Sequence, residues 1–356
     1  MAAVTLDRPC LVEAEYGDLD GFLADDHLAF WDVFARSAAA EGGASLRSAV
    51  APSDQIRRAA AALTAQGRPP VGGAALDLIQ SVLRPYRVDL DGDGFLTGYF
   101  EPTLHGSIER TPEFMAPVLP RLRGFDHSGP GVADQPGRVR REIEVEAAAG
   151  QHPVVVWLRD WVEVFILQVQ GCGRVVLPDG RTLRLVYDGR NGRPYTSIGR
   201  VLIETGEIAA AEMSLDRLKA WIRENGQAAG DIGRALMWRN ESYVFFRAEA
   251  ADNGGPIGGQ GVRLESLRSI AIDRTLWPYG LAYWIEADLP WRSDRTEPFR
   301  RLMVGQDTGS AIVGAARADL FFGTGDAAGQ RAGAIRHPCR MWVLLPAGSD
   351  AQPAAP

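Results

Sequence analysis

The chain has 356 residues, of which 46% are hydrophobic and 23% charged, a composition typical of a globular protein long enough for two domains. Its formal net charge is −7 and it has no run of lysine or arginine, which argues against nucleic acid or an anionic membrane surface as the main partner. The apolar runs are too short to span a bilayer, and the N-terminal residues lack the basic and apolar regions of a signal peptide, so none is expected in this sequence.

Several classes of chemistry have no matching motif. The three cysteines allow at most one disulfide and do not have zinc-ligand spacing, and the five histidines are scattered. HExxH, GxSxG and Walker motifs are absent. We therefore expect neither metal, serine-hydrolase nor nucleotide chemistry, and no cofactor.

The first eighty or so residues have the apolar spacing of helices. Three segments are predicted as helices: 27–40, which follows Asp25 and Asp26; 54–67, which follows Ser53; and 74–86, which ends at Pro85. We expect them to pack together as a helical layer.

The segment 88–102, VDLDGDGFLTGYFEP, begins like a calcium-binding EF-hand loop. The residues that match its opening are Asp89, Asp91, Asp93 and Gly94. The twelfth position must supply a bidentate carboxylate but is Phe100, so calcium is not expected. We interpret DGDG instead as a tight hairpin turn that leads into a strand.

This strand ends with Tyr99, Phe100 and Glu101. An aromatic ring beside a carboxylate suits stacking on a sugar ring, whereas half-buried aromatic residues of strands also pack in cores. The sequence leaves both interpretations open.

From about residue 103 to 245, short strands alternate with turn signals such as PDG at 178–180. We expect strands over 153–160 and 162–189. Gln168 and Gln170 would bring amides to the end of the strand over 162–170, and Gly171 and Gly173 would leave room for a ligand at the backbone. A β-bulge accounts for the same residues equally well. Short helices are then predicted after Ser197, Ser214 and Asp231.

The Gly- and Ala-rich stretch 248–261 marks a domain junction. Two strand-like segments follow, joined by the turn WPYG at 277–280. Asp273 follows the first of them and precedes Arg274, a position that suits a buried ion pair or a turn.

Two carboxylates lie in apolar surroundings near the C-terminus. Asp307 follows the apolar run Leu302–Val304, and Asp319 precedes Leu320–Phe322. Loss of solvation raises the pKa of a carboxyl above its usual value of about 3.9, as a general acid near neutral pH requires. The alternative is that Asp307 caps a turn and Asp319 is a polar residue on a strand edge.

Five motifs, in the same order over roughly residues 85 to 347, resemble the membrane-bound lytic murein transglycosylase A family. They are LTGYFEP (96–102), VFILQVQGCGRV (164–175), YDGRNGRPYTSIGRVLIETGEI (187–208), AIDRTLWPYG (271–280) and VGQDTGSAIVGAARADLFFGTGDAAGQRAG (304–333). The last two match the family's C-terminal 3D region, named for three aspartates, which here would be Asp273, Asp307 and Asp319.

The resemblance implies a mainly β protein with flanking N-terminal helices. A double-psi β-barrel domain would combine 1–102 with 246–347, a smaller β domain would be inserted at 103–245, and 348–356 would be a disordered tail. A groove between the domains would hold a glycan strand. Its substrate-binding residues would be Tyr99, Phe100, Glu101, Gln170, Gly171, Gly173, Tyr195, Ser197 and Asp273.

The implied reaction cleaves the β-1,4 bond between N-acetylmuramic acid and N-acetylglucosamine in peptidoglycan without water. By family position, Asp319 would protonate the glycosidic oxygen and then accept the proton of the substrate's C6 hydroxyl as this attacks C1, giving a 1,6-anhydro product. Asp307 would help to keep Asp319 protonated, since nearby carboxylates raise each other's pKa.

The resemblance also concerns partners and place in the cell. The partners would be peptidoglycan glycan strands, with cell-wall synthesis or division proteins as further partners of a monomer. The location would be the periplasm or outer membrane of a Gram-negative bacterium. Many members carry a lipidated cysteine, but the residues before Cys10 lack the small apolar side chains that such a site needs, so anchoring is not expected from this sequence.

Two other functions fit the residues. An inverting hydrolase on the same fold would use Asp307 and Asp319 as base and acid, with carboxyl groups about 6.5–9.5 Å apart. A non-catalytic glycan-binding module of the cell envelope would retain its function when Asp319 is replaced by asparagine.

Overall fold

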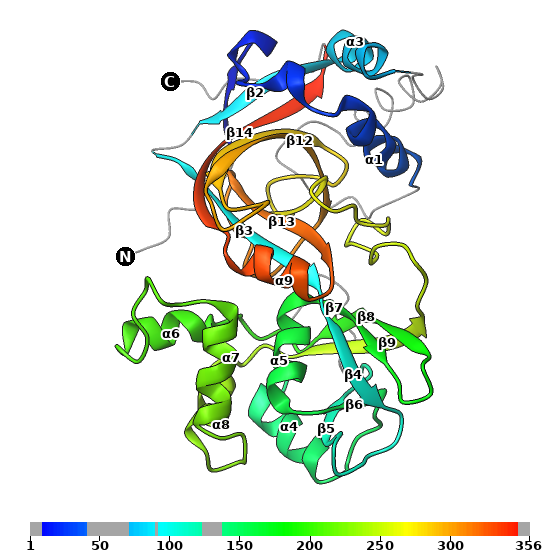
Figure 1. Ribbon diagram of the computed structural model, residues 1–356, viewed down its shortest axis with the longest axis vertical. Helices are drawn as coiled ribbons and strands as arrows, with labels where there is room; N and C mark the ends of the chain where they lie inside the picture. Colours follow the sequence, from blue (N-terminus) through cyan, green and yellow to red (C-terminus); the bar gives the residue numbers. More distant parts are fainter. Residues whose placement is uncertain (1–8, 41–70, 90–91, 123–136, 348–356) are drawn as a thin grey trace. The chain divides into compact units, whose positions relative to one another are not determined.

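The computed structural model describes residues 9–40, 71–89, 92–122 and 137–347, and internal contacts divide the chain into two compact units (Figure 1). The barrel unit comprises Met1–Tyr99, Ile257–Gly323 and Ala334–Pro356, and the second unit comprises Phe100–Pro256 and Thr324–Gly333. This division differs from the predicted boundaries in three places, because residues 100–102, 246–256 and 324–333 group with the second unit. The predicted tail at 348–356 and the helix predicted after Ser53 lie outside the described residues.

The barrel unit is built on a closed ring of six strands (Figure 1). In order around the ring these are β14 (Arg336–Pro346), β11 (Ala282–Leu289), β12 (Glu297–Asp307), β10 (Ser269–Ile272), β13 (Arg317–Thr324) and β3 (Gly94–Glu101), and β3 pairs again with β14. The pair β10–β12 is parallel, whereas β11–β12, β10–β13 and β14–β3 are antiparallel. Closure leaves none of these six strands as an exposed edge.

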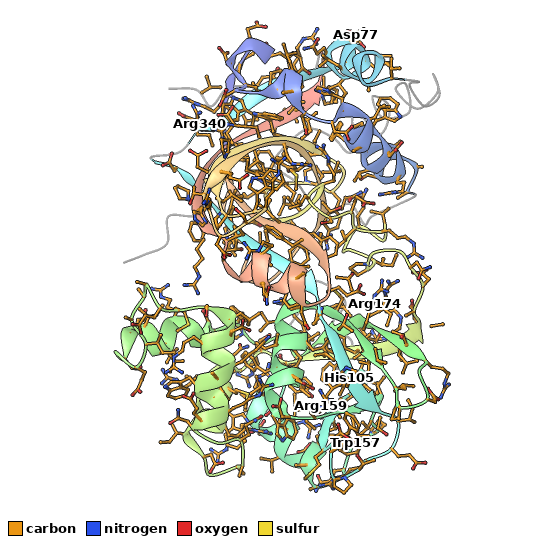
Figure 2. All side chains as sticks on the ribbon, in the orientation of Figure 1. Asp77, His105, Trp157, Arg159, Arg174 and Arg340 are labelled. Carbon is orange, nitrogen blue, oxygen red and sulfur yellow. The ribbon has the colours of Figure 1, made fainter. Side chains whose placement is uncertain are left out.

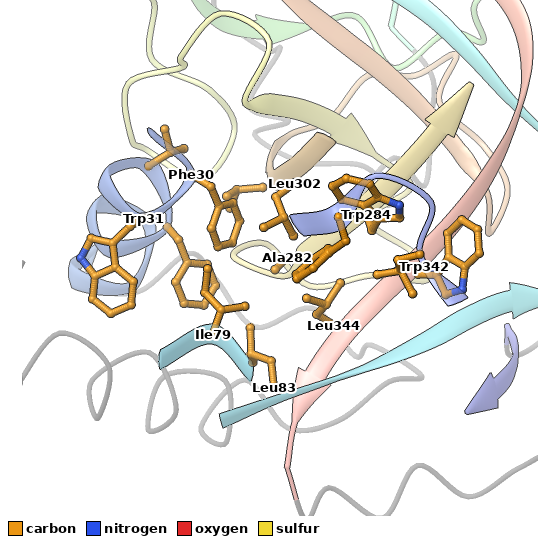
Figure 3. Close-up of a cluster of buried hydrophobic side chains, with 14 residues drawn as sticks. Phe30, Trp31, Ile79, Leu83, Ala282, Trp284, Leu302, Trp342 and Leu344 are labelled. Carbon is orange, nitrogen blue, oxygen red and sulfur yellow. The ribbon is translucent and has the colours of Figure 1, made fainter. Parts of the chain in front are cut away.

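N-terminal elements extend and cover this ring. The strands β2 (Leu83–Asp89) and β1 (Cys10–Glu13) continue the sheet from β14, and α1 (His27–Ala39) and α3 (Gly72–Val82) pack beside them. Asp26 caps α1 as predicted, because its side chain accepts a hydrogen bond from the Ala29 amide. Figure 3 shows Phe30 and Ile79 of these helices facing Leu302 and Leu344 of the barrel strands in one buried cluster.

Two local predictions in this unit were wrong. The third helix ends at Val82 rather than at Pro85, because a proline disfavours helical geometry in the residue before it and the chain becomes extended as β2. The predicted hairpin also does not form among the described residues: β2 pairs with residues 342–346 of β14 and β3 with residues 336–339.

The second unit has a six-stranded sheet of its own and most of the helices. Its strands, in sheet order, are β5 (Ala116–Val118), β6 (Val156–Leu158), β4 (Thr103–Ser107), β7 (Cys172–Val176), β8 (Thr182–Arg190) and β9 (Val244–Ala250). Its helices are α4 (Arg140–Ala148), α5 (Trp161–Gln170), α6 (Ile198–Glu204), α7 (Leu215–Glu224), α8 (Ile232–Trp238) and α9 (Asp326–Gly333). The predicted turn at 178–180 joins β7 to β8, and the helices predicted after Ser197, Ser214 and Asp231 are confirmed.

The predicted strand at 162–170 is instead the helix α5. Asp160 caps its N-terminus by accepting from the Glu163 amide, and Gly171 ends it with a positive φ of 78°. The apolar residues of this segment are divided between two cores, so the spacing typical of a single apolar helix face is lost.

The mainly β fold, with a closed barrel, a second sheet and N-terminal helices, confirms the predicted fold class. Within the described residues, no helix combines the length and apolar character needed to cross a membrane.

Candidate active site

The strand register in the barrel unit places Asp307 and Asp319 on either side of the same residue of β10. Ala271 of β10 is paired with Asp319 of β13 on one side and with Asp307 of β12 on the other. Directly opposed residues project from the same face of a sheet, and two strand spacings separate the Cα atoms by about 10 Å. The pairing skips Gln306, so a β-bulge turns Asp307 to the face of Asp319.

Asp319 lies on an interior strand of the barrel, not on a sheet edge. It is half-buried, and its Oδ1 accepts a hydrogen bond from the Thr97 hydroxyl at 2.5 Å. Thr97 in turn accepts one from Arg317 Nη2 at 2.6 Å. Arg317 stands two residues before Asp319 on β13, so both side chains project from the same face.

Asp307 is held more completely. Its Oδ1 accepts from the amides of Gly259 and Thr308, each at 2.9 Å, and its Oδ2 accepts from the Tyr99 hydroxyl at 2.9 Å. The bond to Thr308 is the local turn contact that the sequence allowed, whereas Gly259 comes from a distant loop. Three donors therefore fix the orientation of this carboxyl.

Both carboxyls have a raised pKa. Burial raises the pKa of Asp319 to about 6; the nearby Arg317 and the Thr97 hydrogen bond act in the opposite direction, and the charge of Asp307 adds to the increase. Burial also raises the pKa of Asp307, against the effect of its three hydrogen bonds. The apolar cluster that includes Tyr99, Ala271 and Phe321 provides the low-polarity surroundings. The site thus contains a carboxyl able to donate a proton near neutral pH.

Asp273, the third predicted aspartate, organises loops. It is 4% exposed, and its Oδ1 accepts from the amide and hydroxyl of Thr275. Its Oδ2 accepts from the Gly314 amide at 2.8 Å. These bonds correspond to the turn role that the sequence allowed, and a contact of Asp273 with substrate stays a prediction.

Glu101 has a structural position within the second unit. Its carboxylate is fully buried and accepts from Arg174 Nε and Arg184 Nε, both at 2.9 Å, and from the Thr324 hydroxyl at 2.7 Å. Arg174 is labelled in Figure 2. The same arginines donate to the Gly254 carbonyl, so the network also holds the chain near the end of the stretch Phe100–Pro256. Full burial leaves Glu101 no surface for a ligand in this structure.

Four further residues predicted to bind substrate lie close together where α5 meets β7. They are Phe100, Gln170, Gly171 and Gly173. The Phe100 amide donates to Gln170 Oε1 at 3.0 Å. Gly171 ends α5, and a Cβ on Gly173 would approach Leu167 Cδ1 to 2.6 Å. The two glycines therefore serve a helix end and close packing, and substrate contact by these residues stays a prediction.

Tyr195 and Ser197 lie in and at the end of the loop before α6. Tyr195 is half-buried, and the exposed Ser197 caps α6 through the Arg200 amide. Their predicted contact with substrate is likewise a prediction.

Family models match the two parts of the chain that carry these residues. Residues 95–247 match the MltA specific insert domain, and residues 268–345 match the 3D domain. The membrane-bound lytic murein transglycosylase A of Escherichia coli is 33% identical over 262 residues, which are 71% of this chain and 66% of that relative. The chain belongs to the membrane-bound lytic murein transglycosylase A family. The match spans just under two thirds of the relative's own length.

Solved structures of this family share the fold. A membrane-bound lytic murein transglycosylase from Agrobacterium tumefaciens superposes with a TM-score of 0.84 at 29% identity, covering 95% of this chain and 98% of its own. MltA of Escherichia coli with bound chitohexaose gives a TM-score of 0.68 at 25% identity, covering 96% and 95%.

Three members of the site were missed from the sequence: Thr97, Gly259 and Arg317. Thr97 lies inside the family motif LTGYFEP, two residues from Tyr99, so strand periodicity already placed both on one face. Arg317 was detectable in the same way, two residues before Asp319. Gly259 gave no signal, because its amide reaches Asp307 across 48 residues of chain.

Proposed function

We propose that this member of the family is a lytic transglycosylase that cleaves the β-1,4 bond between N-acetylmuramic acid and N-acetylglucosamine in peptidoglycan. The observation that carries the proposal is the contrast between the two carboxyls. Asp307 has both oxygens engaged by three donors, whereas within the described residues Asp319 has one hydrogen-bonded oxygen and one without a donor. Asp319 is therefore the group able to exchange a proton with a substrate.

In the proposed reaction, protonated Asp319 donates its proton to the glycosidic oxygen as the bond from this oxygen to C1 breaks. The carboxylate that remains accepts the proton of the muramic acid C6 hydroxyl, whose oxygen bonds to C1. A single aspartate thus acts first as acid and then as base, and no water is consumed. A pKa of about 6 leaves roughly one-tenth of Asp319 protonated at pH 7.

Asp307 has a supporting role in this proposal. Its negative charge raises the pKa of Asp319 and so favours the proton-bearing form. Its hydrogen bonds to Gly259 and Tyr99 keep that charge in place. Peptidoglycan strands as the partner, and the periplasm or outer membrane as the location, belong to the same proposal and are supported by the chitohexaose complex and the names of the relatives.

Mass spectrometry of fragments released from purified peptidoglycan tests the proposal. The wild type should release muropeptides one water lighter than hydrolysis products, and Asp319→Asn should lower this release by about a thousandfold or more. Asp216→Asn is the matched control, because the Asp216 side chain is 79% exposed on α7. Products with free reducing ends would show the hydrolase instead. Peptidoglycan binding without release by the wild type would show a binding module.

A further inference from the structure

Thr97 connects Arg317 to Asp319 by two hydrogen bonds of fixed direction. Arg317 Nη2 lies 2.6 Å from Thr97 Oγ1, and this oxygen lies 2.5 Å from Asp319 Oδ1. A guanidinium has only donors, so the threonine oxygen must accept from Arg317. The single hydroxyl proton of Thr97 is then directed to Asp319.

Arg317 is held in this arrangement by its own surroundings. Its Nη1 donates to the Ala318 carbonyl, and its guanidinium lies 5.6 Å from the centre of the Phe95 ring. Among the described residues, no carboxylate forms an ion pair with it at 4.0 Å or less. Its charge therefore acts on Asp319 with Thr97 between them.

Other titratable groups border this chain of bonds. Asp307 on β12 carries the opposing negative charge. Cys339 on β14 lies near Arg317 and Asp93, and burial raises the pKa of its thiol to about 12, so that it is neutral. Arg317 is thus the positive group that faces Asp319.

We propose that Arg317 is a positioning residue that acts through Thr97, fixing this hydroxyl as a donor to Asp319 Oδ1 so that Oδ2 carries the proton exchanged with substrate. Without Arg317, the hydroxyl is free to rotate and accept a proton from Asp319, which would then point its proton away from the substrate. The role in catalysis rests on the proposed function; the direction of the hydrogen bonds does not.

The sign of the expected pH effect follows from the charges. The cation and the donated hydrogen bond both favour the carboxylate, so loss of either raises the pKa of Asp319, by about one unit for the cation. Activity requires protonated Asp319 and falls as pH rises through this pKa. Arg317→Gln should therefore move the alkaline limb of the pH profile upward and lower kcat about ten- to hundredfold through lost orientation.

The experiment combines activity with a titration that needs no substrate. The 13C-carboxyl signal of Asp319, assigned by its absence in Asp319→Asn, is followed with pH in the full chain. Arg317→Gln and Thr97→Val should raise its midpoint, whereas Arg317→Lys and Thr97→Ser should stay near the wild type. Arg295→Gln removes an equal charge from an exposed turn of the same unit and should change nothing.

The outcomes separate this inference from the proposed function. Midpoints and pH profiles of Arg317→Gln and Thr97→Val that match Arg295→Gln would overturn it and leave Arg317 a structural residue. A wild type that titrates as expected but releases no anhydro product would contradict the proposed function and leave the hydrogen-bond chain standing. If Arg317→Gln does not fold, the pair Thr97→Val and Thr97→Ser decides the question.

Discussion

Asp319 in the barrel unit and Glu101 in the second unit are both carboxyls withdrawn from solvent near arginine, yet their compensation differs. Glu101 bonds directly to the Nε atoms of Arg174 and Arg184. Asp319 accepts a hydrogen bond from the neutral hydroxyl of Thr97, and Thr97 lies between it and Arg317. A buried charge is costly unless it is paired, so direct pairing holds Glu101 in a structural role.

The difference shows how a direct or an indirect arginine contact separates a structural carboxylate from one proposed to exchange a proton. Thr97 weakens the effect of Arg317 by distance, and Asp307 opposes it, so burial dominates and the pKa of Asp319 rises to about 6. Arginine near a carboxylate is therefore not by itself a sign of a permanent ion pair. The group that lies between the two decides which role the carboxylate has.

The first prediction, which has the largest expected effect, tests the structural role of Glu101. Glu101→Gln removes the negative charge that Arg174 and Arg184 share, and Arg184, whose side chain is only 4% exposed, then has Asp252 as its carboxylate partner among the described residues. Breaking a buried pair in this way typically costs about 3–5 kcal/mol. The free energy of unfolding, measured by urea denaturation at pH 7, should fall by about this amount.

An exposed pair provides the control. Glu204 lies 2.7 Å from Arg200 on α6, with side chains 58% and 78% exposed, and Glu204→Gln should change the free energy of unfolding by no more than about 1 kcal/mol. Equal effects of the two substitutions would mean that the Glu101 network does not hold the second unit together.

The second prediction concerns the cost of burying Asp319. A folded-state pKa of about 6, above the unfolded value, means that the folded state holds its proton to higher pH, so stability falls as pH rises from about 4 to 6. Asp319→Asn removes this penalty. The variant should be more stable than the wild type at pH 7 by up to about 3 kcal/mol.

The pH dependence makes this prediction specific. Below pH 4 the wild-type carboxyl is protonated in both states, so the advantage of Asp319→Asn should disappear there. Thermal unfolding at pH 4 and pH 7 measures it. A variant equally or less stable than the wild type at pH 7 would show that Asp319 is not buried at a cost.

Sequence reasoning located the two aspartates because apolar neighbours and strand position are local features. It could not place Asp307 relative to Asp319, since their common face depends on a bulge at Gln306 and on β10 lying between two strands distant in sequence. A shift of register by one residue reverses the face, and no periodicity reports such a shift.

The substrate-binding prediction for Glu101 shows another limit. Its motif places an acidic group beside aromatic residues, which is equally typical of a glycan site and of a buried pair. The two arginines that decide its surroundings lie 73 and 83 residues away. For α5, by contrast, the signal was present: Asp160 and Gly171 mark the two ends of a helix, but the apolar β-branched residues between them favoured a strand.

The third and smallest effect is expected for Tyr99→Phe. This substitution removes the hydroxyl that donates to Asp307 and so tests how Asp307 influences Asp319. The phenyl ring retains the contact with Phe321, whose centre lies 5.3 Å from that of Tyr99, so only the hydroxyl is lost. Removing one donor from a charged carboxylate should cost about 1–2 kcal/mol in unfolding free energy at pH 7. The cost should shrink as pH falls through the pKa of Asp307, because the neutral carboxyl depends less on this donor.

The same substitution should act on Asp319 in the direction opposite to Thr97→Val. The Tyr99 hydrogen bond lowers the pKa of Asp307, so its loss raises that pKa and leaves Asp307 less charged wherever it titrates. A weaker negative charge then lowers the pKa of Asp319, and its 13C-carboxyl midpoint should move down rather than up. Tyr187→Phe, on the second unit, is the control and should leave that midpoint unchanged. A Tyr99→Phe midpoint that rises would mean that the two carboxyls do not titrate as a coupled pair, and the contrast with Glu101 would then rest on the arginine contacts, direct for Glu101 and through Thr97 for Asp319.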